Sequence, residues 1–512
     1  PLFLGWIDKC FVFASELKAF KKIFSGALAI DDNSQAAFFR FGYVPTPYSI
    51  YKNIYKLMPG TYLRIPLAVN TSPNKFNPLP DKTCFSPIPY WALSDVSRPI
   101  SSSIITDEQE AVIRFDSLLH DVIAEQKIAD VPLGTFLSGG VDSSLISAIL
   151  QKVSDRPVQT FTIGFTEKEF DEAPYARAIA RHIGSDHQEY YVSADDGLAL
   201  VEDIPFYWDE PFADSSQIPS LLVAKMARKK VTVCLTGDGG DELFCGYNRY
   251  FASIKLWSII QNIPHALRKL MGKSLLMIPE HCWQQFYTSY KRLMNDTRTQ
   301  SNIGLKIQKM AGLMCAESMP GAYRYLMSYW HDPGNVVNYH QEAFSIIDRE
   351  PDPMLGDFIH DAMYWDQLGY LVDDNLVKGD RSSMAFSLET RLPFLDRRIV
   401  EFSWQLPLVM KYQNGKSKWL LRKVLSNYVP DSLINRPKMG FSVPIRDWLK
   451  GPLKIWASDL IHSEYVSVSE TLNGKNIKRV WNEHQKGSHD HSHKLWTLCM
   501  WLAWVRYGQY SL

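Results

Sequence analysis

Cysteine is scarce in this sequence, and its seven residues follow no paired pattern. No two of them have the Cys-x-x-Cys spacing, and their odd number leaves at least one without a disulfide partner. These observations argue against a disulfide framework and against a structural zinc site, so we expect a protein of the reducing cytoplasm. The seven residues are Cys10, Cys84, Cys234, Cys245, Cys282, Cys315 and Cys499.

The sequence also lacks a charge excess and a long apolar run. Lysine plus arginine and aspartate plus glutamate both number 55, so the formal net charge is zero. This balance gives no general attraction to nucleic acid or to an anionic membrane. Apolar runs such as residues 495–505 are too short to span a bilayer, and no signal peptide is visible. We therefore expect no nucleic-acid partner and no membrane.

An initiator methionine is absent as well. The chain opens at Pro1 and runs directly into the strand-like residues 2–6. A domain rarely begins in the middle of a strand, so we expect that the first part of a longer chain is missing from these 512 residues.

What is present suits a large folded protein. With 512 residues, of which 46% are hydrophobic, we expect two domains. Residues 1–66 alternate short apolar runs with turns and are predicted to be β-rich. Residues 67–106 are rich in proline, asparagine and serine, which predicts a linker. Residues 107–512 form the second predicted domain, and Asp107 opens a long helix.

Strand-like and helical runs alternate from residue 131 to about residue 236. Residues 134–137, 159–164 and 231–235 are strand-like, and the amphipathic run 145–152 lies between the first two. Such alternation predicts an α/β fold with a parallel sheet and flanking helices. The remainder of the chain is rich in aromatic residues and predicts a helical C-terminal part.

The segment from Ser138 to Ser144 reads Ser-Gly-Gly-Val-Asp-Ser-Ser between a predicted strand and a predicted helix. Glycines let the backbone approach an anion, and a helix N-terminus offers unpaired N–H groups to it. The segment lacks the Gly-Lys-Ser/Thr of a Walker A loop and the three-glycine spacing of a dinucleotide fingerprint. We predict a pyrophosphate cradle; the alternative is an ordinary glycine turn with a serine cap.

Further motifs follow a recognisable order along nearly the whole chain. They are Phe13-Ala-Ser-Glu-Leu-Lys, Gly42-Tyr-Val-Pro, Leu57-Met-Pro-Gly, Ser-Gly-Gly-Val-Asp-Ser-Ser at 138–144, Phe170-Asp-Glu-Ala, Asp-Glu-Pro-Phe-Ala-Asp-Ser-Ser at 209–216, Thr-Gly-Asp-Gly-Gly-Asp-Glu-Leu-Phe at 236–244, Ser-Leu-Glu-Thr-Arg-Leu-Pro-Phe-Leu-Asp at 387–396 and Arg-Pro-Lys-Met-Gly-Phe at 436–441. The loop at 138–144 resembles the PP-loop of the ATP pyrophosphatases. The full set resembles the asparagine synthase, or glutamine-dependent amidotransferase, family.

The resemblance implies a fold, a reaction and a cofactor. Residues 107–512 are expected to form an ATP pyrophosphatase domain with an adenine nucleotide α-hydrolase-like fold. Residues 1–66 are expected to be the β-rich end of an N-terminal nucleophile amidotransferase domain. The implied reaction is the ATP-dependent amidation of a carboxylate, most simply aspartate to asparagine, with Mg²⁺ as cofactor and AMP and pyrophosphate as products.

The resemblance also implies the residues that bind ATP. Phe136 and Ile163 are expected to hold the adenine, and Gly237 to let the backbone approach the ribose or a phosphate. Asp142 and Asp241 are expected to hold Mg²⁺, which prefers oxygen ligands; the alternative for Asp241 is a helix cap or turn residue. The predicted ATP and pyrophosphate set is Phe136, Ser138, Gly139, Gly140, Asp142, Ser143, Ser144, Ile163, Thr236 and Gly237.

Two residues are predicted to be catalytic. Lys438 resembles the family's lysine that stabilises the adenylate-forming transition state, where a fixed cation offsets charge that develops on the α-phosphate. Asp238 stands where asparagine synthetases commonly carry glutamate, a residue thought to assist the ammonia step. Its side chain is one methylene shorter, which motivates a different substrate as an alternative.

The amino-acid pocket is predicted from two further motifs. Asp214 and Ser215, in the segment 214–216, are expected to contact the substrate. Glu389 and Arg391 are expected either to contact the substrate or to form a structural ion pair.

The family's glutaminases use an N-terminal cysteine as nucleophile, with its α-amine as base. Pro1 is not such a residue, and Cys10 lies where the family places no nucleophile. We therefore expect that this chain does not hydrolyse glutamine, whereas a longer parent does and passes ammonia to the synthetase site. The implied small-molecule partners are ATP, aspartate and glutamine or ammonia. The resemblance leaves open whether the chain forms a homodimer.

Two other functions stay open. One is an amidotransferase of the same chemistry that acts on another carboxylate in surface-polysaccharide or peptide biosynthesis. The other is a non-catalytic partner protein that keeps the fold. The histidine run His489, His491 and His493 would suggest a metal site, but we interpret it as a solvated turn before a helix near Lys494.

Overall fold

The computed structural model describes residues 1–7, 10–24, 28–65, 76–81, 85–98, 103–167, 171–260, 262–279, 282–283, 285–289, 303–338, 345, 347, 357–435 and 443–510. Within these ranges, no helix combines the length and the apolar character needed to cross a bilayer.

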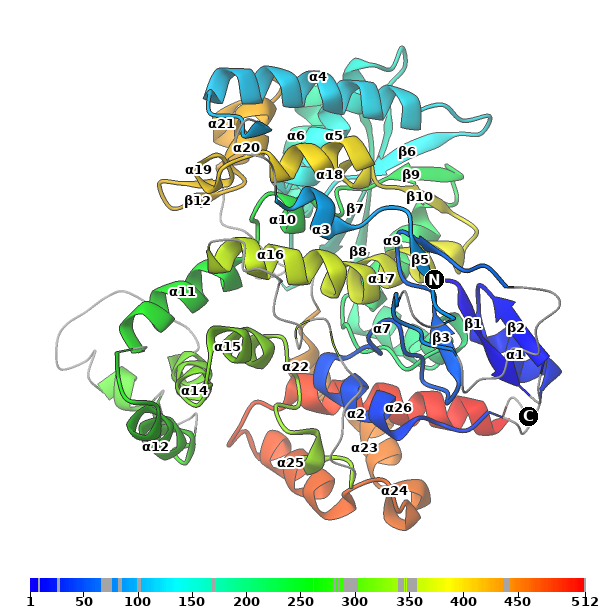
Figure 1. The fold of residues 1–512 in the computed structure, drawn as a ribbon, viewed down its shortest axis with the longest axis vertical. Coiled ribbons are helices and arrows are strands. Elements are labelled where there is room, and N and C mark those ends of the chain that lie inside the picture. Colours follow the sequence, from blue (N-terminus) through cyan, green and yellow to red (C-terminus); the bar gives the residue numbers. More distant parts are fainter. Residues whose placement is uncertain are drawn as a thin grey trace.

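A five-stranded parallel sheet lies at the centre of the predicted second domain and confirms the α/β fold (Figure 1). Its strand order is β10-β9-β6-β7-β8, and every neighbouring pair is parallel. The strands are β6 (Leu133–Phe136), β7 (Gln159–Phe165), β8 (Asp186–Val192), β9 (Val233–Leu235) and β10 (Glu389–Arg391). After its first residue β7 is buried throughout, as expected of a strand that is covered on both faces.

Helices cover both faces of this sheet. The helices α5 (Val141–Lys152) and α6 (Ala173–Ile183) connect β6, β7 and β8 and pack on each other, with α4 (Glu108–Gln126) against α5. The helix α9 (Gln217–Ala227) leads from β8 to β9 and packs on β7 and on α17 (Leu376–Met384). Because parallel crossovers are right-handed, the return from β8 to β9 places α9 on the face opposite α5 and α6.

This topology determines where a ligand can bind. The chain leaves β6 toward β7 on one side and leaves β9 toward the opposite edge of the sheet. Loops that diverge in this way open a crevice at the carboxyl ends of the strands, which is the usual ligand position in open α/β sheets. The predicted phosphate loop follows β6, and residues 236–241 follow β9, so both motifs line this crevice.

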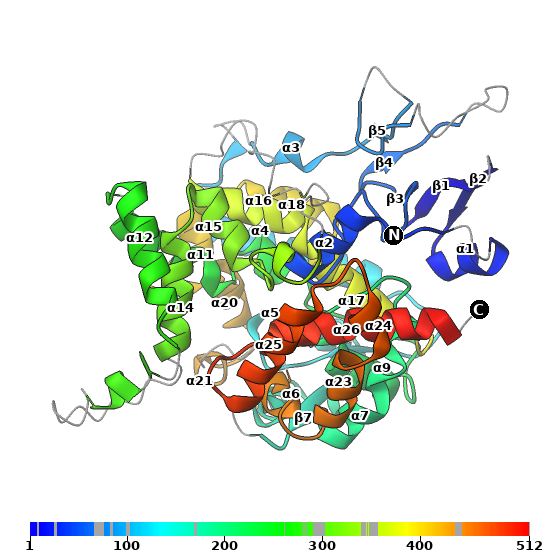
Figure 2. The same ribbon diagram turned by 90° about the horizontal axis from the view of Figure 1, so that it is seen from below.

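Residues 1–65 contain a separate antiparallel sheet with the order β2-β1-β3, which confirms the predicted β-rich N-terminal part (Figure 2). Its elements are β1 (Phe3–Ile7), β2 (Cys10–Ala14) and β3 (Ile54–Lys56), with the helices α1 (Leu17–Ile23) and α2 (Asp32–Phe41). Ion pairs join this part to the sheet domain. Arg381 Nη1 lies 2.8 Å from Glu16 Oε1, and Lys56 Nζ lies 2.8 Å from Glu210 Oε2.

Shorter elements and the helical C-terminal part complete the described chain. Two small antiparallel sheets pair β4 (Thr61–Tyr62) with β5 (Ile88–Pro89), and β11 (Tyr412–Gln413) with β12 (Lys416–Ser417). The other helices are α3 (Leu93–Val96), α7 (Ala194–Val201), α8 (Ile204–Tyr207), α10 (Gly240–Leu243), α11 (Asn248–Ile260), α12 (His265–Leu276), α14 (Ile303–Met314), α15 (Met319–Leu326), η3 (Pro333–Asn335), α16 (Phe358–Leu368), η5 (Leu371–Asn375), η6 (Pro393–Leu395), α18 (Arg397–Trp404), α19 (Leu408–Lys411), α20 (Trp419–Leu425), α21 (Asp431–Ile434), α22 (Ile445–Trp448), α23 (Lys454–Ile461), α24 (Glu464–Val468), α25 (Gly474–Lys486) and α26 (Ser492–Tyr510).

The last helix, α26, connects the C-terminal part to the N-terminal part, and its end runs toward α1 in both views (Figures 1 and 2). Trp501 is fully buried, and its ring centroid lies 5.5 Å from that of Phe39. The Trp504 indole donates a hydrogen bond to the Asp209 carbonyl at 3.0 Å. The aromatic stripe of this helix is therefore core.

Candidate functional site

A cavity of about 580 Å³ opens at the carboxyl ends of the central strands. Its volume falls within the range of about 300–1,000 Å³ that is common for small-molecule sites. Most of the predicted site residues line it, namely Phe136, Ser138, Gly139, Gly140, Asp142, Ser143, Ile163, Asp214, Thr236, Gly237, Asp238 and Asp241. Phe136 ends β6 and Ile163 lies within β7, so the two predicted adenine contacts come from neighbouring strands.

The loop between β6 and α5 is held in a tight, defined conformation. Gly139 has a φ of 74°, in the left-handed region that favours glycine, and a Cβ there would lie 2.9 Å from the backbone nitrogen of Ala176. Ser143 Oγ accepts a hydrogen bond from the backbone N–H of Ser138 at 3.1 Å and lies 3.0 Å from Ser138 Oγ. Gly140 caps α5. A helix N-terminus carries unpaired N–H groups and a partial positive charge, so this loop suits a phosphate.

The loop that follows β9 packs directly on this first loop. A Cβ at Gly237 would lie 2.8 Å from the backbone nitrogen of Ser143, and a Cβ at Gly240 would lie 2.5 Å from Asp142 Oδ1. A side chain at Gly237 would therefore push the two loops apart, and one at Gly240 would displace the Asp142 carboxylate. Their contact brings Asp142 and Asp241 to the same part of the cavity wall.

These two aspartates meet at one ammonium group. Lys418 Nζ contacts Asp142 Oδ2 and lies 2.6 Å from Asp241 Oδ1. Lys418 is only 5% exposed, and its backbone φ is 58° at the start of α20. Burial alone would lower the pKa of Lys418, but the two carboxylates outweigh burial and raise it. Lys418 is thus a permanent cation in the cavity wall.

The aspartate pair also has the right chemistry for the predicted cofactor. Mg²⁺ takes oxygen ligands and bridges phosphates, and two carboxylates that converge beside a phosphate loop supply such oxygens. Asp142 and Asp241 therefore fit Mg²⁺, with Lys418 as a further positive charge beside them.

A second, half-buried ion pair lies in the same cavity. Lys378 Nζ, from α17, lies 2.6 Å from Asp214 Oδ2 and donates to Asn375 Oδ1 at 3.1 Å. Asp214 Oδ1 also accepts hydrogen bonds from the N–H and the hydroxyl of Ser216, both at 2.8 Å. Burial would raise the pKa of Asp214, but Lys378 and these hydrogen bonds lower it to about 2. The pair presents a cation and an anion at fixed positions, whereas Ser215 is buried and does not line the cavity.

Asp238 faces the cavity and makes a local hydrogen-bonded turn. Thr236 Oγ1 donates to Asp238 Oδ2 at 2.8 Å, and the Asp238 N–H donates to Thr236 Oγ1 at 3.3 Å. Asp238 is exposed to the open cavity. Partial desolvation there raises the pKa of Asp238, and the hydrogen bond from Thr236 and the charge of Lys378 oppose this rise. A carboxylate with a raised pKa is a better proton acceptor than an ordinary aspartate.

Glu242, which sequence reasoning did not single out, also lines the cavity. Its side chain is 1% exposed, and Oε1 accepts hydrogen bonds at 2.7 Å from the Tyr247 hydroxyl and from Asn375 Nδ2. Burial raises the pKa of Glu242 to about 7, and the charge of Asp241 adds to the rise. Its protonation therefore changes near neutral pH.

Several of the predicted site residues do not line the cavity. Ser144 is fully buried within α5 and does not line the cavity. Glu389 and Arg391 lie on β10 and pair with each other at 2.6 Å, and Arg391 Nη1 donates to the carbonyls of Gln126 and Ile128. The pair thus holds the edge of the sheet to the end of α4, away from the cavity. Lys438 lies outside the described residues.

Sequence reasoning also missed both cavity lysines. Lys418 lies in the stretch Asn414-Gly-Lys-Ser-Lys, where nothing distinguishes it from Lys416. Lys378 had a weak signal, because it belongs to a charged run, residues 373–381, that interrupts an apolar helical pattern.

The site and the fold agree with two family matches. The asparagine synthase family profile matches residues 114–506, and the glutamine amidotransferase domain profile matches residues 1–76. The predicted boundaries of 66 and 106 stay predictions.

Individual proteins are similar over most of the chain. A putative glutamine-hydrolysing asparagine synthetase of Mycobacterium tuberculosis is 33% identical over 466 residues, which cover 90% of this chain and 65% of that protein. The glutamine-hydrolysing asparagine synthetase 1 of Bacillus subtilis is 28% identical over 98% of this chain and 73% of its own length. The amidase chyE of Penicillium rubens is 24% identical over 82% of this chain and 62% of its own length.

The chain therefore spans a little less than two thirds of the length of the mycobacterial relative, 65% of it. The family match, by contrast, covers the sheet domain and most of the helical C-terminal part, including every residue of the cavity that the structure describes. The chain belongs to the asparagine synthase family, with an N-terminal part that matches a glutamine amidotransferase domain.

Proposed function

We propose that the chain catalyses the ATP-dependent amidation of a carboxylate through an acyl-adenylate, most simply aspartate to asparagine. The observation that carries this proposal is the convergence of Asp142 and Asp241 on Lys418, beside the glycine loop after β6. With Mg²⁺ held by the two aspartates and Lys418 beside them, this group would supply positive charge to a pyrophosphate leaving group. The seven cysteines follow no paired pattern, which supports a cytoplasmic setting for the reaction.

In the first half-reaction an oxygen of the substrate carboxylate attacks the α-phosphorus of ATP, and the bond from that phosphorus to the β-phosphate bridging oxygen breaks. The loop from Ser138 to Ser143 and the cation Lys418 hold the departing pyrophosphate. Asp142 and Asp241 would hold Mg²⁺, which supplies positive charge to the phosphates. Groups fixed in place before reaction need no reorganisation, which is the main source of such stabilisation.

The ion pair of Lys378 and Asp214 suits an amino-acid substrate. The ammonium of Lys378 can attract a carboxylate, and the ionised Asp214 can attract an α-ammonium group. Both groups are fixed by hydrogen bonds, so the substrate meets a preorganised site.

In the second half-reaction ammonia attacks the acyl carbon, and the bond to the AMP oxygen breaks. The nitrogen must lose a proton for the amide to form. Asp238, whose pKa is raised and which faces the cavity, is the proposed acceptor of that proton.

Glutamine, hydrolysed by a longer parent of this chain, is the proposed source of the ammonia. The match of residues 1–76 to a glutamine amidotransferase domain supports this source. The ion pair of Arg381 with Glu16 joins that part to the helix that carries Lys378.

A second candidate is the same chemistry on a different carboxylate. Asp238 is shorter than the glutamate that asparagine synthetases commonly have, and the relatives include proteins named amidases. The intact group of Asp142, Asp241 and Lys418 speaks against a third candidate, a non-catalytic partner protein.

The test is product formation by the purified chain with ATP, Mg²⁺, ammonium chloride and one carboxylate at a time. Asparagine, AMP and pyrophosphate in equal amounts would support the aspartate assignment. AMP and pyrophosphate with another carboxylate alone would replace aspartate as substrate. If neither nucleotide binding by calorimetry nor AMP is found with any carboxylate of the panel, the enzymatic proposal fails.

A further inference from the structure

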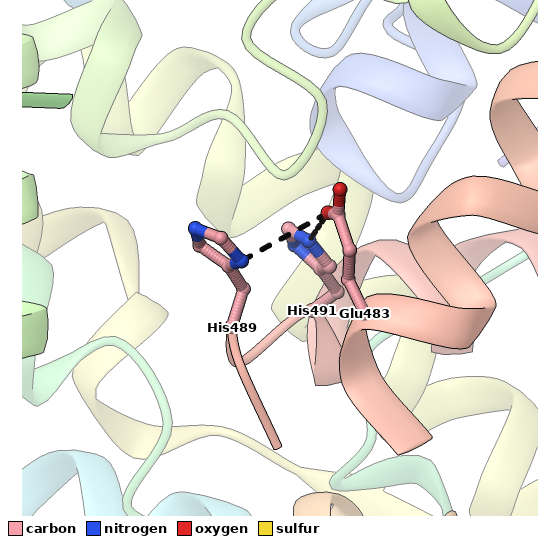
Figure 3. Close-up of side chains that lie close together, drawn as sticks. All are labelled: Glu483, His489 and His491. Carbon is pink, nitrogen blue, oxygen red and sulfur yellow. Dashed lines mark hydrogen bonds and ion pairs between the residues drawn. The ribbon is translucent and has the colours of Figure 1, made fainter. Parts of the chain in front are cut away.

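Glu483, His489 and His491 form a cluster of side chains (Figure 3). It lies at the turn between α25 and α26, and none of the three residues lines the cavity. Glu483 belongs to the last turn of α25, and His489 and His491 belong to the short loop before α26. The sequence predicted a solvated turn here. The structure instead half-buries both imidazoles, with 26% of the His489 side chain and 13% of the His491 side chain exposed.

Three potential ligand atoms converge in this cluster. His491 Nε2 lies 2.8 Å from Glu483 Oε2, and His489 Nδ1 lies 4.0 Å from the same oxygen. All three atoms lie within 4.8 Å of one another. Ligands at about 2.0–2.1 Å from a tetrahedral zinc ion are about 3.4 Å apart, which lies between the two observed separations. Small side-chain rotations would therefore suffice to form the site.

The cluster contains a buried nitrogen that lacks a hydrogen-bond partner. His489 Nδ1 has almost no solvent contact and forms no hydrogen bond within the described part of the chain. An unpaired buried polar atom is costly, and a bound cation would satisfy it. The His489 and His491 rings are stacked, with 5.5 Å between centroids and an angle of 10° between planes. Neither ring is therefore free to turn away without losing this contact.

The charged groups around the cluster are compatible with a bound cation. Arg479 Nη1 pairs with the other oxygen of Glu483, Oε1, at 2.6 Å, so Oε2 stays directed at the histidines. The Lys494 ammonium lies over the Trp330 ring, 5.7 Å from its centroid. Asp490, next in the chain to both histidines, contributes negative charge, and Arg446 lies 3.7 Å from its Oδ2.

We infer that Glu483, His489 and His491 form a binding site for a divalent transition-metal ion of the zinc class. Two imidazoles and one carboxylate are a donor set that suits zinc, with water at the fourth position. Mg²⁺ prefers oxygen ligands alone, so this site and the aspartate pair of the cavity select different ions. None of the three residues lines the cavity.

The bound ion ties the end of α25 to the start of α26. Further along α26, Trp501 and Trp504 contact the N-terminal part and the segment at Asp209. The metal therefore restrains the helix that joins the two parts of the chain. Its effect should appear in stability, independently of the amidation reaction.

The test uses the untagged full chain after chelator treatment, with Mg²⁺ in excess to occupy the aspartate pair. Calorimetric titration with Zn²⁺ should show one site per chain, and bound Co²⁺ should give the strong visible absorption of a tetrahedral site with nitrogen ligands. The double variant His489→Ala/His491→Ala should weaken binding by more than about a hundredfold, because even outer-shell partners of a metal contribute about 10–100-fold.

The matched control is His462→Ala, which removes an exposed histidine elsewhere on the helical part. This variant should bind Zn²⁺ like the original chain, and Glu483→Gln should weaken binding without removing a histidine. The same affinity in the double variant, or a Co²⁺ spectrum of an all-oxygen site, would overturn the assignment. Thermal melting without metal verifies that each variant is folded.

Discussion

Lys378 and Arg381 lie one turn apart on α17 and pair with acidic residues in two different places. Lys378 Nζ pairs with Asp214 in the cavity at 2.6 Å, whereas Arg381 Nη1 pairs with Glu16 of the N-terminal part at 2.8 Å. The segment 209–216 likewise contacts both places. Asp209 accepts a hydrogen bond from the Leu17 N–H of the N-terminal part, and Asp214 lines the cavity. Two chain segments thus connect the interface between the parts to the candidate site.

Replacement of Arg381 by alanine should loosen this interface. Arg381 is 7% exposed, and its Nη2 lies 3.5 Å from the buried Asp209 Oδ2. Loss of one partner of a buried ion pair costs about 3–5 kcal/mol. The free energy of unfolding, measured in denaturant, should fall by about this amount. Arg114→Ala, which removes an exposed pair with Glu110, should cost less than about 1 kcal/mol. Equal losses in the two variants would contradict the interface role.

Lys418→Met should lower the rate of adenylation about 10²–10³-fold while the chain stays folded. The variant leaves Asp142 and Asp241 without the cation that both contact, and it removes charge from the proposed pyrophosphate site. Loss of one preorganised electrostatic group commonly lowers kcat about 10²–10³-fold. The measurement is pyrophosphate release with ATP and the accepted carboxylate. Lys416→Met, two residues away and exposed, is the control and should keep its rate; a normal rate in Lys418→Met would remove that residue from the mechanism.

Gly237→Ala should disrupt the contact between the two loops of the cavity. The added Cβ would lie 2.8 Å from the backbone nitrogen of Ser143, so one of the loops must move. Calorimetry should therefore show weaker ATP binding together with a lower melting temperature. Gly508→Ala is the control, because a Cβ there meets nothing within 4 Å, and alanine in a helix is favoured by about 1 kcal/mol. Unchanged ATP affinity in Gly237→Ala would show that the cradle lies elsewhere.

The raised pKa of Glu242 should make the stability of the protein depend on pH. Burial raises the pKa of Glu242 from 4.5 to about 7, so between these values the folded chain binds a proton that the unfolded chain has lost. The free energy of unfolding should therefore decrease as the pH rises through this window. Glu242→Gln should flatten this part of the profile, and the exposed Glu464→Gln should leave it unchanged. A profile that keeps the same slope in Glu242→Gln would assign the effect to other groups.

Cys245 offers a test of backbone strain near the site. This buried residue has a φ of 60°, a conformation that costs side chains about 1–2 kcal/mol and glycine nothing. Cys245→Gly and Cys245→Ala both remove the thiol, so their difference reports the backbone conformation together with one buried methyl group and the greater freedom of glycine in the unfolded chain. The glycine variant should unfold at the higher denaturant concentration; the reverse order would argue against strain at this position.

The strand–turn–helix conformation of residues 133–152 could be predicted from sequence because its determinants are local. A strand, two glycines and a helix start occupy consecutive positions from Phe136 to Val141, and they need no distant residue to be recognised. The same holds for the start of α4, where Asp107 accepts a hydrogen bond from the Glu110 N–H at 2.7 Å, as the sequence predicts.

Lys418 could not be predicted in this way. It reaches Asp142 across 276 positions of the chain, and only the packing of α20 on α5 brings the two together. Glu389 and Arg391 are the opposite case, because the sequence singled them out but the structure places them away from the cavity. Their motif identifies the family, but pairing of β10 with β9 at the edge of the sheet directs Arg391 to carbonyls of the α4 end. Motif likeness does not determine the direction of a side chain.

The contact between the loop after β6 and the loop after β9 has a consequence for when the site forms during synthesis. Residues 138–144 leave the ribosome long before Gly237 and Gly240, and those in turn precede Lys418. A nascent chain that ends before β9 therefore presents only half of the cradle, and one that ends before α20 lacks the cation that balances both aspartates. Under the proposed function, nucleotide consumption would begin only when most of the polypeptide has been translated and folded, so incomplete products would waste no ATP.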